Sequence, residues 1–444
     1  MARLKEYNGY YCESEYEYAF IGFLETEGWI YSSGNNISRV TKRDVLIADD
    51  FKKFIVDTNP DLTEDEVTQI FDNVRLVGSE SDFATLHKVY GWMVNGIQFT
   101  PQDGIARMIP LIDFKKDSNK NIFRVVNQFT VEYTNNGQKE NRRPDVLLFV
   151  NGMPLCVIEL KNPADANATI YDAWEQINIR YWRDIPHLLH YCTLACISDG
   201  VKTRLGTVRT PYEHFYAWRR VNDGDAVSTL PFEETETMIK GVYAPERFLE
   251  IFRDYIYFQD SIYDSDEVEI VCRYPQFFAA RLLRQSIINS VVQKSGKGGT
   301  YFGATGCGKT YTMAFLARQL ALRCTDIPEI GSPTIILIVD RDELQKQGAK
   351  LFTKSKEFLN LGEVAVVKNR AQLRQELGAR QSGGFYICTI QKFCDREDDK
   401  IGLINDRQNI ICFSDEAHRT QLEHSKKIQF SKDADENMKA MVSK

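Results

Sequence analysis

The chain has 444 residues, which is enough for two or three domains with buried cores. Its charged fraction of 26% is ordinary for a globular protein, and no apolar stretch is long enough to cross a bilayer, so a membrane-spanning protein is excluded. The net charge of −7 leaves room for a local basic channel, and ten cysteines without a C-x-x-C pair indicate the reducing cytoplasm and no zinc site.

The first part of the chain is predicted to mix helices and strands. Residues 14–27 and 40–76 have helical patterns, and no apolar signal segment precedes them. An alternating pattern over residues 122–133 predicts strand structure, which ends in the polar turn Thr-Asn-Asn-Gly.

A hairpin is predicted over residues 142–161. Two apolar runs flank Asn151 and Gly152, which together are a strong turn signal. Glu159 and Lys161 share one face of the second run, because side chains alternate along a strand. A carboxylate and an ammonium group at the end of so apolar a strand require a chemical reason.

Asp145, Glu159 and Lys161 are the minimal set for metal-dependent hydrolysis of a phosphodiester. The two carboxylates would hold Mg²⁺, which prefers oxygen ligands, and the metal would polarise the phosphate and help to make hydroxide. Lys161 would position the attacking water or stabilise the developing charge. A solvated strand-end pair is the alternative reading, since E-x-K occurs by chance in charged strands. The apolar context favours the PD-(D/E)xK nuclease pattern.

The register of the hairpin decides whether the two carboxylates meet. A two-residue Asn-Gly loop would pair Asp145 with Ile158 and would put Asp145 and Glu159 on opposite faces. A three-residue loop would pair Asp145 with Val157 and would make the carboxylates diagonal neighbours on one face. If they share a metal ion, the hairpin must therefore have the odd loop or contain an equivalent bulge.

The middle of the chain offers fewer chemical signals. Residues 168–184 have a helical pattern and residues 191–197 a strand pattern. Residues 222–242 are polar and acidic, and they are interpreted as a linker or an excursion. An aromatic-rich helix is expected over residues 245–258, and a further helix is expected to open at Tyr274.

Residues 303–310 match the phosphate-loop pattern G-x-x-x-x-G-K-[ST] at every fixed position. A strand-like run precedes them and a helical pattern follows, as the motif requires. The backbone N–H groups would wrap a triphosphate, Lys309 would reach the terminal phosphates, and Thr310 would hold Mg²⁺. A glycine-rich surface turn is the alternative, which both flanks disfavour. The nucleotide-binding residues predicted here are Gly303, Thr305, Gly306, Gly308, Lys309 and Thr310.

Strands and helices alternate in the last third of the chain, which predicts a parallel sheet covered on both faces. The final strand delivers Asp415-Glu416-Ala417-His418 at its carboxyl end, where the Mg²⁺ partner of Thr310 belongs. Asp415 would bind the metal and Glu416 would activate the water that attacks the γ-phosphate. His418 would link nucleotide state to a second lobe, and a solvated turn is the alternative reading. The expected strands are residues 300–303, 334–339, 363–367, 385–390 and 409–413.

The phosphate loop followed by Asp-Glu-Ala-His resembles superfamily 2 helicases and translocases. Residues 341–344 and 389–391 look like that family's DNA-facing segments, and Gln276 sits where a family glutamine can read adenine. With the nuclease pattern ahead of this motor, the chain is similar to the restriction (R, HsdR) subunit of type I restriction enzymes. The nuclease part of the resemblance is carried by Arg143-Pro144-Asp145, Asn151-Gly152 and Ile158-Glu159-Leu160-Lys161-Asn162-Pro163.

The resemblance also implies further site residues. The family's Gln-x-x-x-Tyr element, which is thought to help bind DNA, corresponds to Gln176 and Tyr181, but the spacing here is one residue longer. On an α-helix this spacing puts Arg180 rather than Tyr181 on the face of Gln176, which weakens the match of Tyr181. The family's first-helix glutamate corresponds to Glu17 or Glu15, and Glu17 is preferred.

We therefore expect an α/β protein in three parts. These are a PD-(D/E)xK endonuclease-like domain over residues 1–240, a helical linker over residues 241–272, and an incomplete RecA-like, parallel-sheet lobe of superfamily 2 over residues 273–444. The resemblance implies an endonuclease that uses ATP and Mg²⁺, translocates double-stranded DNA and cuts unmodified foreign DNA. It also implies methyltransferase (M) and specificity (S) subunits as partners, and no membrane.

The family continues through a second motor lobe beyond the Asp-Glu-Ala-His element. We therefore expect the chain to be a fragment that hydrolyses ATP poorly and does not translocate DNA. Two alternatives stay open, a nucleotide- and DNA-binding module without motor activity and a helicase–nuclease of DNA repair.

Overall fold

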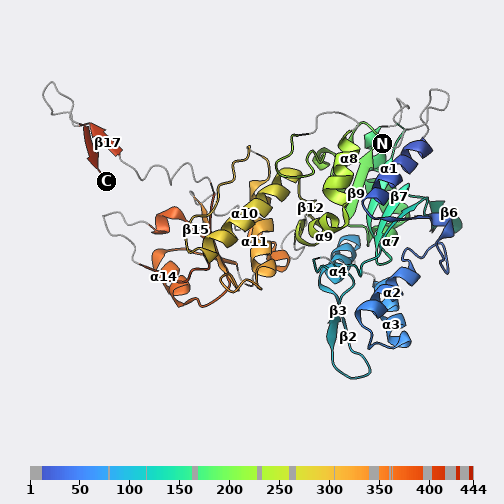
Figure 1. Cartoon of the computed structure of the whole chain (residues 1–444), viewed down its shortest axis with the longest axis horizontal. Helices are drawn as coiled ribbons and strands as arrows, with labels where there is room; N and C mark the ends of the chain where they lie inside the picture. The colour runs from blue at the N-terminus through green and yellow to red at the C-terminus, as the bar shows by residue number, and fades with distance from the viewer. Residues whose placement is uncertain are drawn as a thin grey trace. The chain divides into compact units, whose positions relative to one another are not determined.

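The protein is represented by a computed structural model (Figure 1). The structure describes residues 13–78, 81–116, 118–162, 169–227, 233–259, 267–304, 306–339, 350–359, 362, 364–393, 403–415, 427–430 and 440–443. No helix among these residues is both long and apolar enough to span a bilayer.

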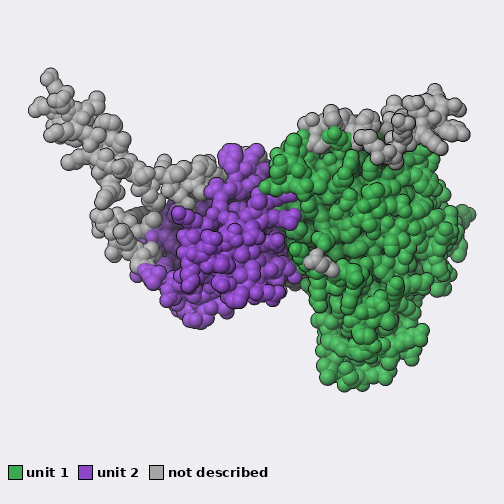
Figure 2. Space-filling view, in the orientation of Figure 1, with its two compact units in different colours: residues 1–258, 267–277 green, residues 259–266, 278–444 purple. Residues whose placement is uncertain are grey.

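Contacts divide the chain into two compact units (Figure 2). Unit 1 contains residues 1–258 and 267–277, and unit 2 contains residues 259–266 and 278–444. The boundary falls inside α10 (Tyr274–Val292), after Phe277. Both units combine helices with sheets, so the expected mixed α/β class is confirmed.

Unit 1 is built on a mixed six-stranded sheet in the order β1-β4-β7-β8-β9-β10. β1 runs parallel to β4 and β8 runs parallel to β9, whereas the other neighbours are antiparallel. Every residue of β7, β8 and β9 is buried, as expected for apolar central strands covered on both faces. The strands are β1 (Ile30–Ser33), β4 (Phe123–Asn127), β7 (Val146–Val150), β8 (Met153–Leu160), β9 (Leu194–Ser198) and β10 (Thr203–Thr207).

Helices lie on both faces of this sheet. α5 (Ile170–Glu175) and the π-helical segment Gln176–Tyr181 cover the face that carries Glu159. α1 (Glu13–Thr26) and the π-helical segment Ile239–Tyr243 cover the other face, where Tyr16 and Tyr243 contact β9 and β8. The remaining helices on this part of the chain are α6 (Trp182–Asp184), α7 (Pro186–Leu189), η3 (Tyr212–His214), α8 (Glu233–Met238) and α9 (Pro245–Asp254).

The segment predicted as a linker packs against unit 1. The indole N–H of Trp29 donates to the carbonyl of Tyr243 at 2.7 Å, and the ring of Phe248 meets the Trp29 ring with a centroid distance of 5.4 Å. Residues 241–258 accordingly fall within unit 1, and they end in β11 (Ile256–Phe258), which forms a small antiparallel pair with β12 (Glu269–Val271). The functional division of the chain at residues 240 and 272 stays a prediction.

A helical extension gathers at one end of unit 1 (Figure 1). The capping box of Thr63 and Glu66 starts its second helix, because each side chain bonds the backbone N–H of the other residue. The elements are η1 (Gly34–Asn36), α2 (Ala48–Thr58), α3 (Glu64–Arg75), α4 (Asp82–Asn95) and the hairpin β2 (Ile97–Phe99) and β3 (Arg107–Ile109).

The strand expected over residues 122–133 is broken in two. β4 ends at Asn127, and Gln128 has a left-handed backbone with φ 53°. The chain then enters β5 (Val131–Asn135), which forms an exposed polar hairpin with β6 (Gln138–Arg142) before it returns to Asp145. The break places Gln128 next to Asp145, whose carbonyl accepts from the Gln128 N–H at 3.1 Å.

Unit 2 contains a four-stranded parallel sheet in the order β14-β15-β13-β16, which confirms the expected parallel arrangement. Its α14 covers one face of the sheet through Leu373 and Leu377, which pack with Ile336 and Tyr386. The elements are η6 (Ile390–Phe393), α11 (Lys309–Arg323), α13 (Lys356–Leu359), α14 (Arg370–Ala379), β13 (Thr334–Val339), β14 (Val364–Val366), β15 (Phe385–Thr389), β16 (Ile410–Ser414) and the separate pair β17 (Lys427–Phe430) and β18 (Ala440–Ser443).

The strand expected at residues 300–303 is not formed. Residues 299–304 are irregular, and the Phe302 side chain is 95% exposed. The glycine-rich stretch before them has few side chains to pack, and β16 forms the edge of the described sheet without a ladder to this segment.

Candidate functional site

The hairpin of β7 and β8 has a two-residue loop and a bulge. Asn151 and Gly152 form the turn with φ 51° and 76°, and Val150 pairs with Met153. The ladder shifts between Phe149, which pairs with Pro154, and Leu148, which pairs with Cys156. Leu155 is therefore the extra residue of a β-bulge. The prediction of a three-residue loop is therefore wrong, and the alternative prediction of an equivalent bulge is confirmed.

The bulge brings Asp145 and Glu159 to the same face. Val146 pairs with Ile158, so Asp145 lies directly opposite Glu159 rather than diagonal to it. The Leu160 N–H donates to Asp145 Oδ2 at 2.8 Å, and the Asp145 N–H reaches Glu159 Oε1 at 3.4 Å. Two carboxylates thus meet at one end of the hairpin.

Glu159 is held in an unfavourable environment for a charge. Its side chain is fully buried, and burial raises its pKa well above the usual range, with the neighbouring Asp145 carboxylate adding to the rise. Oε2 of Glu159 has no hydrogen-bond partner among the described residues, and the Lys161 ammonium lies 3.8 Å away. A buried carboxylate oxygen without a donor fits a place for a cation.

Lys161, Gln176 and Tyr181 surround this carboxylate. Tyr181 donates its hydroxyl to Glu159 Oε1 at 2.6 Å, and Gln176 Nε2 donates to the Tyr181 oxygen at 2.8 Å. The other end of the same amide, Gln176 Oε1, accepts from Lys161 Nζ at 3.0 Å. One glutamine therefore orients both the lysine and the tyrosine that face Glu159.

The π-helical turn explains how Tyr181 reaches the site. Residues 176–181 are wound more widely than an α-helix, so positions i and i+5 fall on one face. The extra residue in the Gln-x-x-x-x-Tyr spacing is absorbed there. The prediction that Arg180 shares the face of Gln176 is wrong, because Arg180 instead pairs with Glu175 at 2.7 Å on the exposed side.

Glu17 lies beside the hairpin through two residues that the sequence analysis missed. Asn127 Nδ2 donates to Glu17 Oε1 at 2.6 Å, and Gln128 Nε2 donates to Glu17 Oε2 at 2.7 Å. Two amide side chains at the end of a strand, directly before a break in the alternation, were the available signal. No cluster of three potential metal ligands is found within the described ranges, so Glu17 does not form a ligand set with the carboxylate pair there.

The phosphate loop of unit 2 has a left-handed backbone at two of its glycines. Gly306 and Gly308 have φ of 79° and 80°, and α11 starts at Lys309. The Lys309 ammonium points back to the Gly303 carbonyl at 3.4 Å. A Cβ at Gly303 would lie 2.6 Å from Cys307 Sγ, so a side chain there would fill the loop. Thr305 lies outside the described residues.

The other predicted nucleotide-site residues are placed less completely. Thr310 lies in the first turn of α11, and Asp415 directly follows β16, where its N–H donates to the Ile338 carbonyl at 2.9 Å. Gln276 belongs to unit 1 and accepts from the Arg273 N–H at 2.8 Å. Glu416, His418 and residues 341–344 lie outside the described residues.

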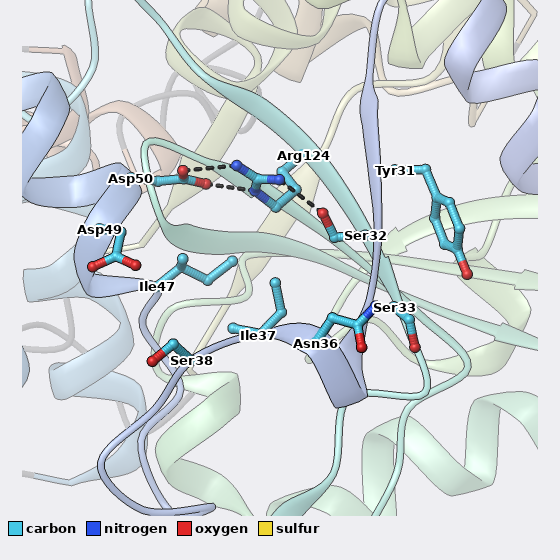
Figure 3. A pocket seen from close by; sticks show the side chains of 10 residues that line it. All are labelled: Tyr31, Ser32, Ser33, Asn36, Ile37, Ser38, Ile47, Asp49, Asp50 and Arg124. Carbon is cyan, nitrogen blue, oxygen red and sulfur yellow. Dashed lines mark hydrogen bonds and ion pairs between the residues drawn. The ribbon is translucent and has the colours of Figure 1, made fainter.

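A separate pocket of about 530 Å³ opens beside β1 and the start of α2 (Figure 3). Arg124 donates to both oxygens of Asp50, at 2.6 and 2.8 Å, and to Ser32 Oγ at 2.7 Å. Since this guanidinium is the cation among the residues that line the pocket and is already paired, the pocket offers no free positive group to a phosphate. None of the predicted site residues lines it.

Two family models match the chain. Residues 10–214 match the type I restriction enzyme R protein N terminus, and residues 275–444 match the SWI2/SNF2 ATPase. The first match contains the carboxylate pair, and the second contains the phosphate loop.

The chain is also similar to whole proteins. It is 30% identical to the type I restriction enzyme HindI endonuclease subunit of Haemophilus influenzae over 438 residues, which cover 95% of this chain and 40% of that relative. A relative from Methanocaldococcus jannaschii is likewise 30% identical over 434 residues, covering 91% and 39%. The SauCOLORF180P endonuclease subunit of Staphylococcus aureus is 26% identical over 307 residues, covering 68% and 29%. The chain thus spans about 40% of the length of the first two relatives.

Proposed function

Because residues 10–214 belong to the N-terminal family of type I restriction enzyme R proteins, we propose that the chain carries the nuclease and nucleotide-binding parts of such a subunit. The enzyme would be a type I site-specific deoxyribonuclease that translocates double-stranded DNA with ATP and cuts unmodified foreign DNA. The observation that carries the nuclease part is the pairing of Asp145 with Glu159, one oxygen of which has no hydrogen bond within the described part of the chain.

Unit 1 is proposed to be a PD-(D/E)xK nuclease domain in which Asp145 and Glu159 bind Mg²⁺. Both side chains supply the oxygen ligands that this ion prefers, and the orphan oxygen of Glu159 fits that role. When bound, the ion would polarise the scissile phosphate and make water a better nucleophile. Lys161 would orient the attacking water or stabilise the charge that develops on the phosphate.

Gln176 and Tyr181 are proposed to organise this site and to face the DNA. Their hydrogen bonds to Lys161 and Glu159 fix the lysine and one carboxylate oxygen before substrate arrives. Such preorganisation lowers the reorganisation needed during reaction.

Unit 2 is proposed to be a RecA-like lobe of superfamily 2 that binds ATP. Its phosphate loop, including Thr305, would wrap the triphosphate, with Lys309 at the terminal phosphates. Thr310 and Asp415 would hold Mg²⁺, and Glu416 would activate water. Gln276 is proposed to read adenine and His418 to couple nucleotide state to a second lobe.

The remaining proposals come from the relatives. Endonuclease subunits of type I enzymes imply double-stranded DNA as substrate and the M and S subunits as partners in the cytoplasm. The chain itself would then contribute cleavage and nucleotide binding, while the sequence of the target is read elsewhere in the complex.

The test is Mg²⁺-dependent nicking of supercoiled DNA by the chain, with Mn²⁺ binding measured by calorimetry on the same samples. We expect Asp145→Ala to lose both, and Lys161→Met to lose nicking by about 100-fold or more while it keeps metal binding. Asp57→Asn, a change at an exposed carboxylate of α2, is the control and should lose neither.

Metal binding that survives Asp145→Ala would sink the nuclease assignment. A different outcome is also possible: the wild type binds ATP, and binds metal through Asp145, but does not nick DNA. This outcome would favour a nucleotide- and DNA-binding module that needs its complex for cleavage.

A further inference from the structure

The last strand of the unit 1 sheet carries a cation on the face of the carboxylate pair. Ile197 of β9 pairs with Glu159 of β8 on one side and with Arg204 of β10 on the other side. Residues that pair directly across neighbouring strands point to the same face of a sheet, so Arg204 shares the face of Glu159. Neighbouring strands are about 4.8 Å apart, which places the Cα atom of Arg204 about 10 Å from that of Glu159.

A second cation lies at the end of the same face. The Asp199 N–H donates to the Lys202 carbonyl at 3.2 Å, so the pairing of β9 with β10 extends to these two residues. Lys202 is two positions before Arg204 and therefore shares its face. The Lys161 N–H donates to the Ser198 carbonyl at 2.8 Å, so Lys202 lies at the same end of the sheet as Lys161.

A third cation lies on the other side of the carboxylate pair. Arg143 is exposed and precedes Asp145 by two residues, which span at most about 7 Å. Its neighbour Arg142 is already engaged, since its guanidinium pairs with Asp184 at 2.6 Å. In the strand order, β7 and β10 lie on opposite sides of β8, which carries Glu159. Cations therefore flank the pair from both sides.

The charges of these three residues are not neutralised within the described part of the chain. The side chains of Arg143, Lys202 and Arg204 have no ion pair or hydrogen bond there. Arg143 and Lys202 are exposed and Arg204 is half-buried. By contrast, the Lys161 ammonium donates to Gln176 Oε1 at 3.0 Å. We call Arg143, Lys202 and Arg204 the flanking cations.

The charge of the site explains what such groups could do. Asp145 and Glu159 carry two negative charges when both are ionised, and Lys161 supplies one positive charge, so these side chains together repel a phosphodiester. The net charge of the chain is −7, so its overall field does not attract DNA either. Cations beside the pair would supply the attraction that positions a DNA backbone.

We propose that the flanking cations bind backbone phosphates of double-stranded DNA on either side of the bond to be cut, and so hold this bond against Asp145 and Glu159. The inference rests on the proposed nuclease function. Phosphate contacts fix the position of DNA without reading its sequence, which suits a subunit whose target is read elsewhere in the complex. Each contact displaces a counterion, so affinity should fall steeply with salt.

The test measures the affinity of the full chain for a short duplex DNA at several salt concentrations. Mg²⁺ is present, and every sample carries Lys161→Met so that the DNA stays intact. The slope of log affinity against log salt concentration counts phosphate contacts, at about 0.9 for each. We expect Arg143→Ala, Lys202→Ala and Arg204→Ala each to reduce the slope by about 1, and the triple variant to reduce it by about 3.

A charge-matched control separates phosphate binding from the general effect of charge. The control triple variant removes the same charge from exposed cations elsewhere in unit 1, and its slope should stay within about 0.5 of the starting value. It combines Arg43→Ala, Lys53→Ala and Lys116→Ala. Arg204→Lys keeps the positive charge and should therefore keep the slope.

Two results would overturn this role of the flanking cations. One is an equal reduction of the slope in the triple variant and in the control triple variant. The other is a chain that does not bind the duplex even at low salt. Either result leaves the nuclease assignment standing when Mn²⁺ binding is lost in Asp145→Ala. Mn²⁺ binding that survives Asp145→Ala would overturn the proposed function, and this inference with it.

Discussion

At the proposed cation site, the Tyr181 hydroxyl would favour the charged form of Glu159. Tyr181 donates to Oε1 of Glu159, and this bond opposes the rise in the Glu159 pKa that burial and Asp145 cause. A carboxyl group with a raised pKa must lose its proton before it binds a cation, so metal affinity at the site should increase with pH.

Tyr181→Phe removes that donor. The Glu159 pKa should rise further, and half-maximal Mn²⁺ binding should move to higher pH. Loss of a buried hydrogen bond should also lower the free energy of unfolding by about 1–3 kcal/mol. Tyr133→Phe is the control, because its hydroxyl donates to Glu140 on the exposed β5–β6 hairpin at 2.6 Å. An unchanged pH profile in Tyr181→Phe would contradict this role.

His187 gives unit 1 a second pH dependence. Burial lowers its pKa to about 4, with the charges of Arg43 and His190 adding to the shift. The folded state thus favours neutral histidine, so stability is full above the ordinary pKa of 6.5 and is lost as pH falls from 6.5 towards 4. Between pH 7 and pH 4.5, we expect His187→Gln to lose about 2 kcal/mol less of its free energy of unfolding than the wild type, as measured by urea unfolding. If the free energy of unfolding falls with pH equally in the variant and the wild type, His187 is not the cause of the loss.

At the scale of elements, residues of α2 and the residue before it pack against the turn of the β7–β8 hairpin. A Cβ at Gly152 would lie 2.2 Å from the Ile47 carbonyl oxygen and 2.9 Å from the Phe51 nitrogen, at a φ of 76°. Gly137, in the β5–β6 turn, has a nearly equal φ of 77° but nothing within 4 Å of its Cβ position. Substitutions of the two glycines can therefore distinguish the cost of backbone strain from the cost of steric crowding.

Gly137→Ala should lower the free energy of unfolding by about 1 kcal/mol, from strain alone. Gly152→Ala should cost about 2–4 kcal/mol, because the backbone of α2 must also move. Chemical denaturation of the two variants measures the difference. Equal losses of the free energy of unfolding in the two variants would show that α2 moves aside at little cost.

The π-helical turn allows a deletion test of the same kind. Removing Ile179, which is 48% exposed, should leave an α-helix in which Gln176 and Tyr181 are four positions apart and still meet. We expect Mn²⁺ affinity within about threefold of the wild type. Deletion of Ala173, a buried residue in the α-helical part, should abolish binding, since it rotates Gln176 away from Lys161. Loss of binding in both deletions would refute the argument.

The sequence predicted the hairpin, and its parity argument showed that the carboxylates meet only with an odd loop or a bulge. It did not locate the bulge at Leu155, because β8 is buried and nearly all apolar, so an extra residue leaves no break in the pattern. The contact of Tyr181 with Glu159 was missed for a related reason. A fixed α-helical period was assumed where the helix widens. The left-handed backbone of Gln128 could not be predicted, because a glutamine in that conformation has no strong local signature.

At the scale of the whole molecule, the two proposed activities reside in different compact units. The phosphate loop lies in unit 2, and the carboxylate pair lies in unit 1. Lys309→Ala should abolish ATP binding and leave Mn²⁺ binding to unit 1 unchanged, and Asp145→Ala should do the reverse. Calorimetric titrations with each ligand measure this. A cross effect larger than about threefold would indicate that the two sites are coupled within this chain.

The prediction of unit 2 from the sequence was more complete for its strands than for its site. Unbroken apolar runs such as residues 334–339 and 385–389 formed the expected parallel strands, because burial on both faces leaves few alternatives. The run at residues 300–303 is short and directly follows Gly298 and Gly299, and it pairs with no strand of the described sheet. The hydrophobic pattern thus predicted the strands that are buried on both faces. It did not predict whether a short run has a neighbouring strand to pair with.

The widened turn at residues 176–181 has a consequence for how relatives of this chain are recognised. A motif written as letters at fixed intervals assumes one helical pitch, so a search for Gln-x-x-x-Tyr passes over this chain although the amide and the phenol touch at 2.8 Å. Insertions of one residue are usually taken as signs that a site has decayed. Here the spacing differs by one residue and the hydrogen bond between the two side chains is present, so relatives should be compared by which atoms meet rather than by how many letters separate them.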